Sequence, residues 1–417
     1  MNESRIRGIN RTIRTIMTLK ERIPLLKDHH SHPYLYASLA GCPDLRFVDD
    51  KRRALELIRK NITKDTVNVA IGWNDSLYRF TPVELDPFPP LIIMNASLHS
   101  FVMNSTAMDE LAPRYPELIA NLGDSEWIER NAGLVLEFVM GISPCDAERM
   151  GEFYVQLAEQ GVWYAEEMSL WHAGEIELFD KSLLSDRSRF WATMGLFMGL
   201  EKDDAARVHG IKIFADGALG SRTAKLSVPY QGGEEGFLIH DDVKLLDLLN
   251  MAAQVGKDIA VHAIGDRAIE QVVDAVARLE KRSQRTRIEH CQFITLDIAR
   301  RAKSLGIVLS MQPNFSFESG FYRDRLPDPY PVMNNPFRML IDEAGFVPGE
   351  GLLFGSDGMP HGAQYAIQSA LFPPFPGQRL TLSEFVAGYC MPDLTHGFID
   401  LTIDQEERNV TTKVTLK

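Results

Sequence analysis

The chain has 417 residues, of which 45% are hydrophobic, and this is ample for a large buried core. Its formal net charge of −13 at pH 7 argues against nucleic acid or an anionic membrane as a partner, because both favour a basic face. The four cysteines are scattered without a CxxC pair, and no apolar stretch is long enough for a signal peptide or a membrane span. We therefore expect a reduced, cytoplasmic protein.

Apolar, β-branched runs predict eight strands. The first is expected at 23–28, and the others at 162–166, 190–194, 211–215, 259–263, 286–291, 307–311 and 353–357. Helix-period segments between the later strands lie at 243–255, 267–281, 296–305 and 336–344. Alternation of strands and helices implies a parallel sheet, and eight strands are the number that closes a (β/α)8 barrel.

A long stretch separates the first predicted strand from the second. Residues 45–145 exceed what one helix needs and are rich in proline and aromatic residues, so we interpret them as an insertion that caps the active site at the barrel mouth. The barrel itself is then expected from 23–44 together with 146–390. Residues 391–417 form a C-terminal tail, which is either a strand pair or frayed, and the residues before the first strand read as a charged helix.

Two histidines follow the first predicted strand. His30 and His32, in Asp28-His29-His30-Ser31-His32-Pro33, lie on the same side of an extended chain, because side chains alternate with a period of two. Two imidazoles that converge on one point suit zinc, nickel, iron or manganese. Taken alone, the pattern is more often a polar loop without a metal, which Pro33 favours.

Three further side chains end predicted strands. His262 and His290 each close an apolar run that a helical pattern follows, and Asp357 follows Leu-Leu-Phe-Gly-Ser. Each has a structural explanation, either as a core histidine bonded to a backbone carbonyl or as a carboxylate that caps the next helix. Because a barrel aims its strand ends at one cavity, two such histidines on consecutive strands favour a shared site. A carboxylate beside a metal can bind it and also accept a proton from water.

Lys212 interrupts the apolar strand Gly-Ile-Lys-Ile-Phe. A free ammonium is costly there unless it is paired or exposed. Lys212 either reaches the surface or pairs with Asp216, or CO2 converts it to a carbamate, a bidentate anion able to bridge two metals. The residues alone favour pairing.

Three other residues are weaker candidates. Arg222 lies just past the fourth strand in Gly-Ser-Arg-Thr, where it either clamps a substrate or makes a loop salt bridge. His99 lies in the insertion and is either a substrate contact or a surface histidine. Glu137 reads as a strand-end carboxylate. We expect the insertion to line the substrate pocket through Trp73 and His99.

The ordered set of motifs resembles the amidohydrolase superfamily. Its order is HxH, Lys, His, His and Asp on strands 1, 4, 5, 6 and 8. More specifically, the segments 210–224, 261–269 and 287–292 resemble the YtcJ-like, amidohydrolase-3 branch, and so do Gly72-Trp73 and the later His99 and Asn104-Ser105. The resemblance runs from about residue 29 to about residue 389.

This resemblance implies a (β/α)8 TIM barrel with a large insertion after strand 1. It also implies two divalent metal ions, with zinc the expected metal. The implied ligands are His30, His32 and Asp357 for one ion, His262 and His290 for the other, and a carboxylated Lys212 as the bridge. Family members usually carry a small β-sandwich built from both chain ends. Here we expect it to be reduced or missing, because only about 22 residues precede the first strand.

The implied function is that of a metal-dependent amidohydrolase that cleaves a non-peptide C–N bond in an amide or N-acyl compound. Asp357 is the expected proton acceptor, with His99 and Arg222 as further catalytic candidates. The alternatives are an ester or lactone hydrolase, a deaminase, a catalytically silent binding barrel and a Schiff-base lyase that uses Lys212. The expected partner is a small-molecule substrate, with no nucleic acid or membrane, and a homodimer is allowed.

Overall fold

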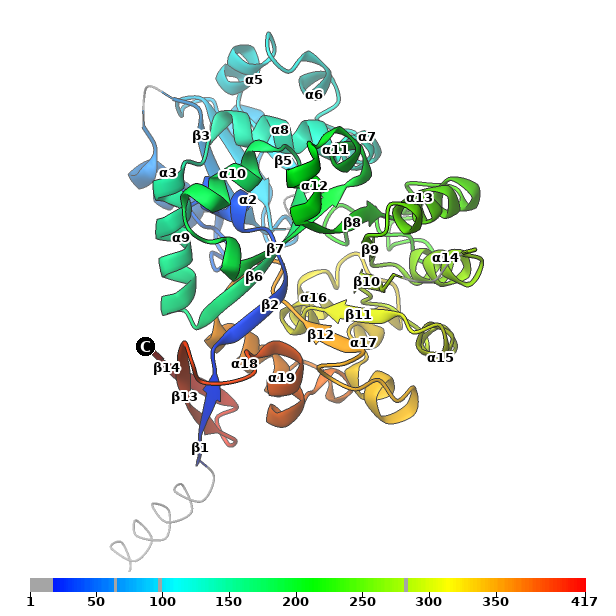
Figure 1. Ribbon diagram of the computed structural model, residues 1–417. Coiled ribbons are helices and arrows are strands. Elements are labelled where there is room, and N and C mark those ends of the chain that lie inside the picture. Colours follow the sequence, from blue (N-terminus) through cyan, green and yellow to red (C-terminus); the bar gives the residue numbers. More distant parts are fainter. Residues whose placement is uncertain (1–17, 64–65, 97–99, 281–283) are drawn as a thin grey trace, which may run out of the picture.

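An eight-stranded parallel sheet forms the centre of the structure, a computed structural model that describes residues 18–63, 66–96, 100–280 and 284–417 (Figure 1). Its strand order is β12-β11-β10-β9-β8-β7-β6-β2. The strands are β2 (Leu26–Ser31), β6 (Val162–Leu170), β7 (Ser188–Thr193), β8 (Val208–Phe214), β9 (Asp258–Ala263), β10 (Thr286–His290), β11 (Val308–Met311) and β12 (Leu352–Phe354). The eight predicted strands and the (β/α)8 TIM barrel are confirmed.

The two ends of this sheet meet through a buried carboxylate. Asp28 on β2 accepts hydrogen bonds from the backbone N–H and the hydroxyl of Ser356, just past β12, and from the hydroxyl of Tyr389. The backbone N–H of Asp357 donates to the carbonyl of His30 at 2.7 Å. These bonds bring the first and last strands of the barrel together, so that the sheet is nearly closed.

Helices cover the outside of the barrel, as the alternation of strands and helices predicts. Those that follow the barrel strands are α2 (Pro33–Ser38), α9 (Ala147–Glu159), α10 (Gly174–Lys181), α11 (Met194–Gly199), α12 (Lys202–Arg207), α13 (Asp242–Gln254), α14 (Asp266–Ala277), α15 (Leu296–Ser304), α16 (Glu318–Phe321), α17 (Tyr330–Met333), α18 (Ala363–Leu371) and α19 (Leu382–Tyr389). Short helical turns are η1 (Ser185–Arg187), η2 (Pro313–Phe317), η3 (Met339–Glu343) and η4 (Pro376–Gln378). The helix predicted at 336–344 is mainly the π-helical turn η3.

Residues between α2 and α9 build a lobe over one end of the barrel (Figure 1). Its sheet pairs β3 (Asn68–Trp73) in parallel with β4 (Leu91–Asn95), and β4 antiparallel with β5 (Phe101–Met103). Its helices are α3 (Lys51–Asn61), α4 (Pro82–Leu85), α5 (Ser105–Leu111), α6 (Pro116–Ala120), α7 (Ser125–Arg130) and α8 (Ala132–Ile142). The lobe has apolar clusters of its own on both faces of this small sheet.

Arginine side chains fasten this lobe to the barrel. The buried guanidinium of Arg325 donates to the carbonyl of Gly220 on the barrel and to Asp75 and Ser76 of the lobe. Arg46 donates to the carbonyl of Gly358 at 3.1 Å. The lobe is therefore held to the barrel at separate points.

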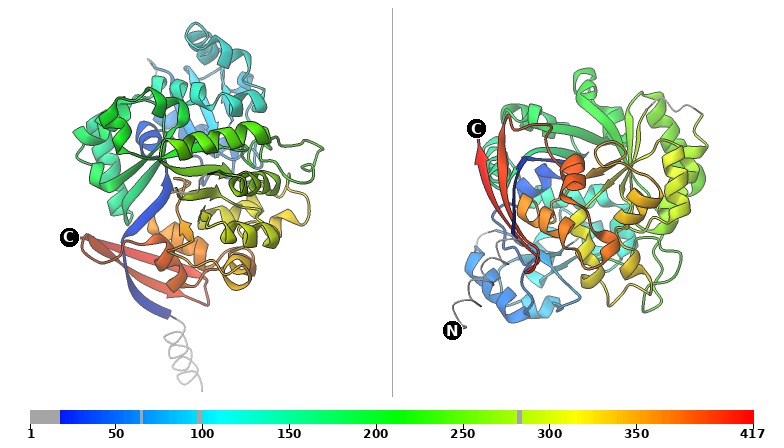
Figure 2. Two further views of the ribbon diagram at one scale, coloured as in Figure 1. Left: turned by 45° about the vertical axis from the view of Figure 1, so that its right-hand side comes forward. Right: turned by 90° about the horizontal axis from the view of Figure 1, so that it is seen from below.

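The two chain ends form a separate antiparallel sheet. Strand β1 (Thr18–Pro24) pairs with β13 (Gly397–Asp404), which pairs with β14 (Asn409–Leu416), and Figure 2 shows β1 beside the two C-terminal strands. The charged helix predicted before the first barrel strand is wrong over residues 18–22, and the remainder of that prediction lies outside the described residues. The strand forms because its charged side chains face solvent, as in the Arg22–Asp400 pair, while Ile23 is buried. Within the described residues, the segments near the two chain ends thus contribute one three-stranded sheet.

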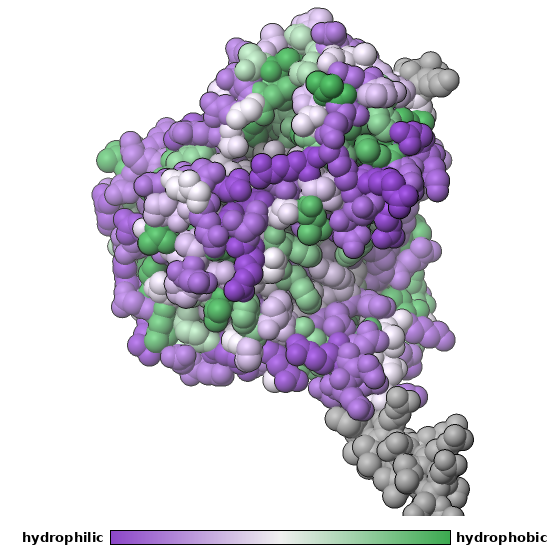
Figure 3. Space-filling model, turned by 180° about the vertical axis from the view of Figure 1, so that it is seen from behind, coloured by the Kyte–Doolittle hydropathy of each residue, from purple (hydrophilic) through white to green (hydrophobic). Residues whose placement is uncertain are grey.

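The face shown in Figure 3 is largely hydrophilic, with apolar residues scattered over it. In the described part of the chain, no helix is both long and apolar enough to cross a membrane.

Replacement of Asp28 tests the closure of the barrel. In Asp28→Ala, the N–H groups of Ser356 and His30 lose a buried acceptor, so the free energy of unfolding should fall by about 3 kcal/mol. Urea titration followed by tryptophan fluorescence measures this change. Asp247→Ala, on the exposed face of α13, is the control and should change stability by less than about 0.5 kcal/mol. A similar, small loss in both variants would contradict the role of Asp28.

Candidate metal centre

Six side chains predicted as metal ligands line one cavity at the carboxyl ends of the barrel strands. His30 lies on β2, Lys212 on β8, His262 on β9 and His290 at the end of β10. Of the other two, His32 follows β2 directly and Asp357 follows β12 after two intervening residues. The structure therefore brings together His30, His32, Lys212, His262, His290 and Asp357.

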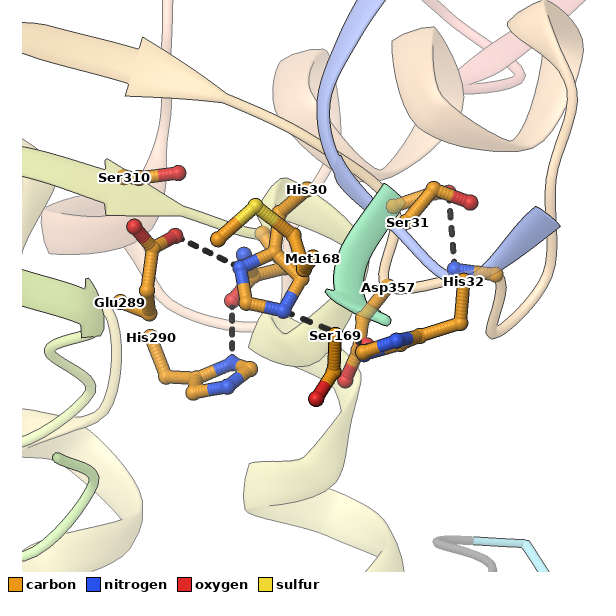
Figure 4. Close-up of polar contacts among 12 residues, drawn as sticks. His30, Ser31, His32, Met168, Ser169, Glu289, His290, Ser310 and Asp357 are labelled. Carbon is orange, nitrogen blue, oxygen red and sulfur yellow. Dashed lines mark hydrogen bonds and ion pairs between the residues drawn. The ribbon is translucent and has the colours of Figure 1, made fainter. Parts of the chain in front are cut away.

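The four imidazoles form a continuous row, and Figure 4 shows three of them, those of His32, His30 and His290. Ring centroids are 5.6 Å apart for His32 and His30, 4.6 Å for His30 and His290, and 4.5 Å for His290 and His262. Asp357 Oδ1 lies 3.2 Å from His32 Nε2 and 3.5 Å from His30 Nε2. One ligand atom from each of His30, His290 and Asp357 falls within 4.8 Å of the others.

Two of these residues have left-handed backbone conformations. The φ angle is +69° at His290 and +55° at Asp357, and such conformations are costly for residues with a side chain. Each is fixed by a backbone hydrogen bond to the neighbouring strand of the barrel. These bonds run from Cys291 N to Ala263 O and from Asp357 N to His30 O. The strand ends thus turn sharply where their ligand atoms enter the cavity.

A buried ionic network orients His30 from below. Glu289 accepts a hydrogen bond from His30 Nδ1 at 2.6 Å, and Arg287 donates to both oxygens of Glu289. The same guanidinium donates to Glu166 at 2.8 Å and to Ser310 Oγ at 3.0 Å. Because Nδ1 carries the proton donated to Glu289, the unprotonated Nε2 faces the cavity, which is the tautomer that a metal ligand requires.

Two of the other three imidazoles are also fixed by neighbours. His290 Nδ1 bonds Gln312 Oε1 at 2.9 Å, and His262 Nε2 bonds the carbonyl of Gly217 at 3.0 Å. Burial lowers the pKa of His290 well below its usual value, and the neighbouring imidazoles add to this effect. Burial lowers the pKa of His30 in the same direction. Both rings are therefore neutral at pH 7, as metal ligands must be.

Lys212 is buried, with 2% of its surface exposed, and its ammonium has no hydrogen-bond partner among the described residues. Its carboxylate neighbour in sequence, Asp216, instead accepts from the backbone N–H groups of Ile264, Gly265 and Lys225. Exposure and pairing with Asp216, the two structural explanations of Lys212, are therefore wrong. Burial lowers the pKa of Lys212 to about 8, so this amine loses its proton more readily than an exposed lysine does.

The residues present fit a metal centre. His30 Nε2 is buried and has no hydrogen-bond partner in the described part of the chain, although such nitrogens are normally satisfied. The donor atoms around it are imidazole nitrogens and a carboxylate oxygen, a set that suits zinc and similar divalent ions. A divalent ion would supply the missing partner of His30.

The other sequence-predicted residues are not brought to the cavity. Arg222 does not line it, and its Nε lies 3.9 Å from Glu234 Oε1. His99 lies outside the described residues. Trp73 packs against Phe80 in the interior of the lobe, so its predicted place in the pocket wall is wrong. Glu137 is exposed on α8 and ends no strand.

Four glutamates in and around the site were missed from sequence, and one of them, Glu129, lines the cavity wall. Glu289 sits beneath His30, while Glu167 and Glu175 line the cavity. The signal for Glu289 was available, because Thr-Arg-Ile-Glu-His places two charges inside a strand that is buried along its whole length. A buried charge of this kind needs a partner and marks a network.

A nearly closed eight-stranded barrel with four histidines, a lysine and an aspartate at its strand ends defines a TIM-barrel protein with a candidate metal centre. The chain belongs to the amidohydrolase family, whose model matches residues 154–365, about half of the chain. This match includes Lys212, His262, His290 and Asp357. It confirms the resemblance drawn from the motifs.

Individual proteins agree with this assignment. The chain is 43% identical over 108 residues to "Putative amidohydrolase YtcJ" of Bacillus subtilis (strain 168), covering 25% of this chain and 20% of that protein. It is 36% identical over 111 residues to "Protein LONG AFTER FAR-RED 3" of Arabidopsis thaliana, covering 25% and 19%. The matched segments thus span about a fifth of the length of these relatives.

Two solved structures share the fold. An uncharacterized metal-dependent hydrolase from Pyrococcus furiosus has a TM-score of 0.64 and 24% identity, covering 88% of this chain and 80% of that one. Another from Pyrococcus horikoshii OT3 has a TM-score of 0.62 and 22% identity, covering 84% and 74%.

Replacement of Glu289 tests the orientation of His30. Glu289→Gln keeps the shape but weakens the acceptor for His30 Nδ1–H, so zinc affinity should fall about 10- to 100-fold. Competition with a chromophoric chelator measures this affinity. Ser310→Ala is the control, because it removes a bond to Arg287 and leaves the Glu289–His30 bond intact. Equal affinities in Glu289→Gln and the parent protein would contradict the orienting role.

Proposed function

We propose that this protein is a metal-dependent amidohydrolase that hydrolyses a non-peptide C–N bond in an amide or N-acyl compound. The observation that carries the proposal is the convergence of His30, His290 and Asp357, whose ligand atoms lie within 4.8 Å at the carboxyl ends of barrel strands. Membership of the amidohydrolase family supports it, and so does the description of the two Pyrococcus proteins as metal-dependent hydrolases.

Two divalent ions, zinc in the simplest case, would be held by distinct sets of ligands. His30, His32 and Asp357 would hold one ion, since Asp357 Oδ1 lies near both imidazoles. His262 and His290 would hold the second. Lys212, unpaired and with a lowered pKa, is suited to react with CO2, and the resulting carbamate would bridge the two ions.

Bound divalent ions supply Lewis acidity, which makes water a nucleophile near neutral pH and polarises a substrate carbonyl. Asp357 would then accept the proton of the attacking water and pass it to the leaving nitrogen. Its side chain is 14% exposed and turned into the cavity by the left-handed backbone, so it can reach both water and substrate. The surrounding imidazoles orient the carboxylate.

A Schiff-base lyase is a second candidate, which the state of Lys212 favours. A buried amine with a pKa of about 8 and no hydrogen-bond partner in the described chain is also suited to attack a carbonyl. The row of four imidazoles has no use in that reaction, and for this reason we prefer the metal-dependent hydrolase. Removal of metal separates the two, because only a lyase would keep its activity.

The first test measures metal content and hydrolysis together. Protein purified from zinc-supplemented medium should contain about two ions per chain. It should release amine from a panel of N-acetyl and N-formyl amines, and lose this activity after chelation. His262→Ala should lower both metal content and rate, whereas His209→Ala, at the opposite end of β8, should change neither. Fewer than one ion per chain, or activity that survives chelation, would overturn the proposal.

A second test concerns Asp357. Asp357→Asn keeps an oxygen ligand but cannot accept a proton at neutral pH, so kcat should fall at least about 100-fold. Metal content should stay closer to that of the parent protein than in His262→Ala. Both are measured on the same preparations by elemental analysis and amine release. A kcat near that of the parent would contradict the assignment of Asp357 as the proton acceptor.

A further inference from the structure

The cavity has two unlike faces. The candidate ligands form its polar floor at the strand ends, and the rest is mostly apolar, with an empty space of about 1020 Å³ including the open mouth. Much of the apolar wall comes from the lobe, through α7, α8 and the end of β4. Its members include Met94, Ile128, Val135, Val139 and Met140.

Every charged side chain that the described residues add to the cavity outside the candidate ligands is acidic. These are Glu129 on α7, Glu167 on β6 and Glu175 on α10. All three are buried, with exposures of 6%, 1% and 0%. In the described lining, Lys212 is the one lysine or arginine, and it belongs to the floor.

These glutamates are held in place by the protein. Glu129 accepts hydrogen bonds from Ser221 and Thr223, at 3.0 and 2.7 Å. Glu167 accepts one from the backbone N–H of Tyr34 at 2.8 Å. They cannot easily turn away from a bound molecule.

Glu175 is the most informative of the three. Its Oε1 accepts from the backbone N–H groups of Trp171 and His172, whereas its Oε2 is buried without a hydrogen-bond partner in the described structure. Burial, together with the nearby charge of Glu167, raises the pKa of Glu175 well above its usual value. A carboxylate of a bound molecule that meets this wall faces these three acidic side chains and, in the described lining outside the floor, no lysine or arginine.

The charge of a substrate determines whether its burial against this acidic wall is favourable. An apolar group gains from leaving water, whereas a carboxylate loses its hydration and finds no cation in return. Rejection by an unpaired charge is a common source of specificity. An arginine clamp would have reversed this preference, but Arg222 lies outside the cavity lining.

We infer that the cavity takes N-acyl amines whose larger substituent is uncharged and apolar, and that it rejects those with a carboxylate on this substituent. This inference rests on the function proposed above, and it names the substrate class of the same site.

Two compounds of nearly identical shape test the inference. N-(4-nitrobenzyl)acetamide is neutral, and 4-(acetamidomethyl)benzoate carries a carboxylate in place of the nitro group. With the zinc-loaded protein, kcat/KM for the nitro compound should exceed that for the benzoate at least about 30-fold. A ratio of about three or less, or a preference for the benzoate, would overturn the inference.

A binding measurement distinguishes a failure of this inference from a failure of the proposed function. If neither compound is hydrolysed, the same zinc-loaded protein is titrated with each by calorimetry. Tighter binding of the nitro compound would then support the inference while the proposed hydrolysis fails. Equal binding, tighter binding of the benzoate, or no binding of either would overturn the inference.

A pair of variants tests the cause of the preference. Ala132, half-buried in the first turn of α8, lines the cavity. Ala132→Arg adds a cation to the wall and should narrow the preference at least about tenfold, by improving kcat/KM for the benzoate. Ala132→Gln adds length without charge and should keep the preference of the parent. Equal effects of the two changes would contradict the electrostatic explanation.

Discussion

The meeting of the first and last barrel strands is the constraint on which the candidate centre depends. His30 and Asp357 are 327 positions apart in the chain, yet their side chains lie 3.5 Å apart. Asp28 makes this possible, because its carboxylate binds Ser356 directly before Asp357 while the backbone of Asp357 binds that of His30. A sheet left open at this seam would keep its fold locally and lose the site.

Beneath the site, the barrel interior is ionic rather than apolar. Arg287 lies between Glu166 and Glu289, and all three are almost completely buried. Burying these three charged groups carries a desolvation cost. The attraction between the charges and their many hydrogen bonds offset this cost. It also fixes one tautomer and one orientation of His30, which an apolar core of the same volume could not do. The desolvation cost of this network is thus linked to its role in holding the candidate metal ligand His30 in one geometry.

The sequence was sufficient for the barrel, because each strand is a distinct apolar run followed by a helical pattern. It was also sufficient to place six candidate ligands around one cavity, because in a barrel the strand ends must converge. It failed for β1, whose charges resemble those of an exposed helix and whose partner strand lies at the far end of the chain. Strand pairing over such a separation leaves no local pattern.

The lobe shows a different limit. Its aromatic content predicted an apolar pocket wall, but composition cannot say whether an aromatic ring faces the pocket or the lobe's own core. Trp73 lies in that core, while aliphatic side chains such as Val135 line the cavity. Likewise, the position of Arg222 after β8 could not show that its loop turns the side chain toward Glu234. Both outcomes depend on tertiary packing.

The arginine attachments of the lobe bear on how molecules enter and leave. Arg325 joins Asp75 and Ser76 to Gly220, and Arg46 binds the carbonyl of Gly358, the residue after Asp357. A lobe attached at these separate points is held in place over the barrel and does not open as a hinged lid. These attachments favour the passage of molecules past the side chains around the opening over a movement of the whole lobe.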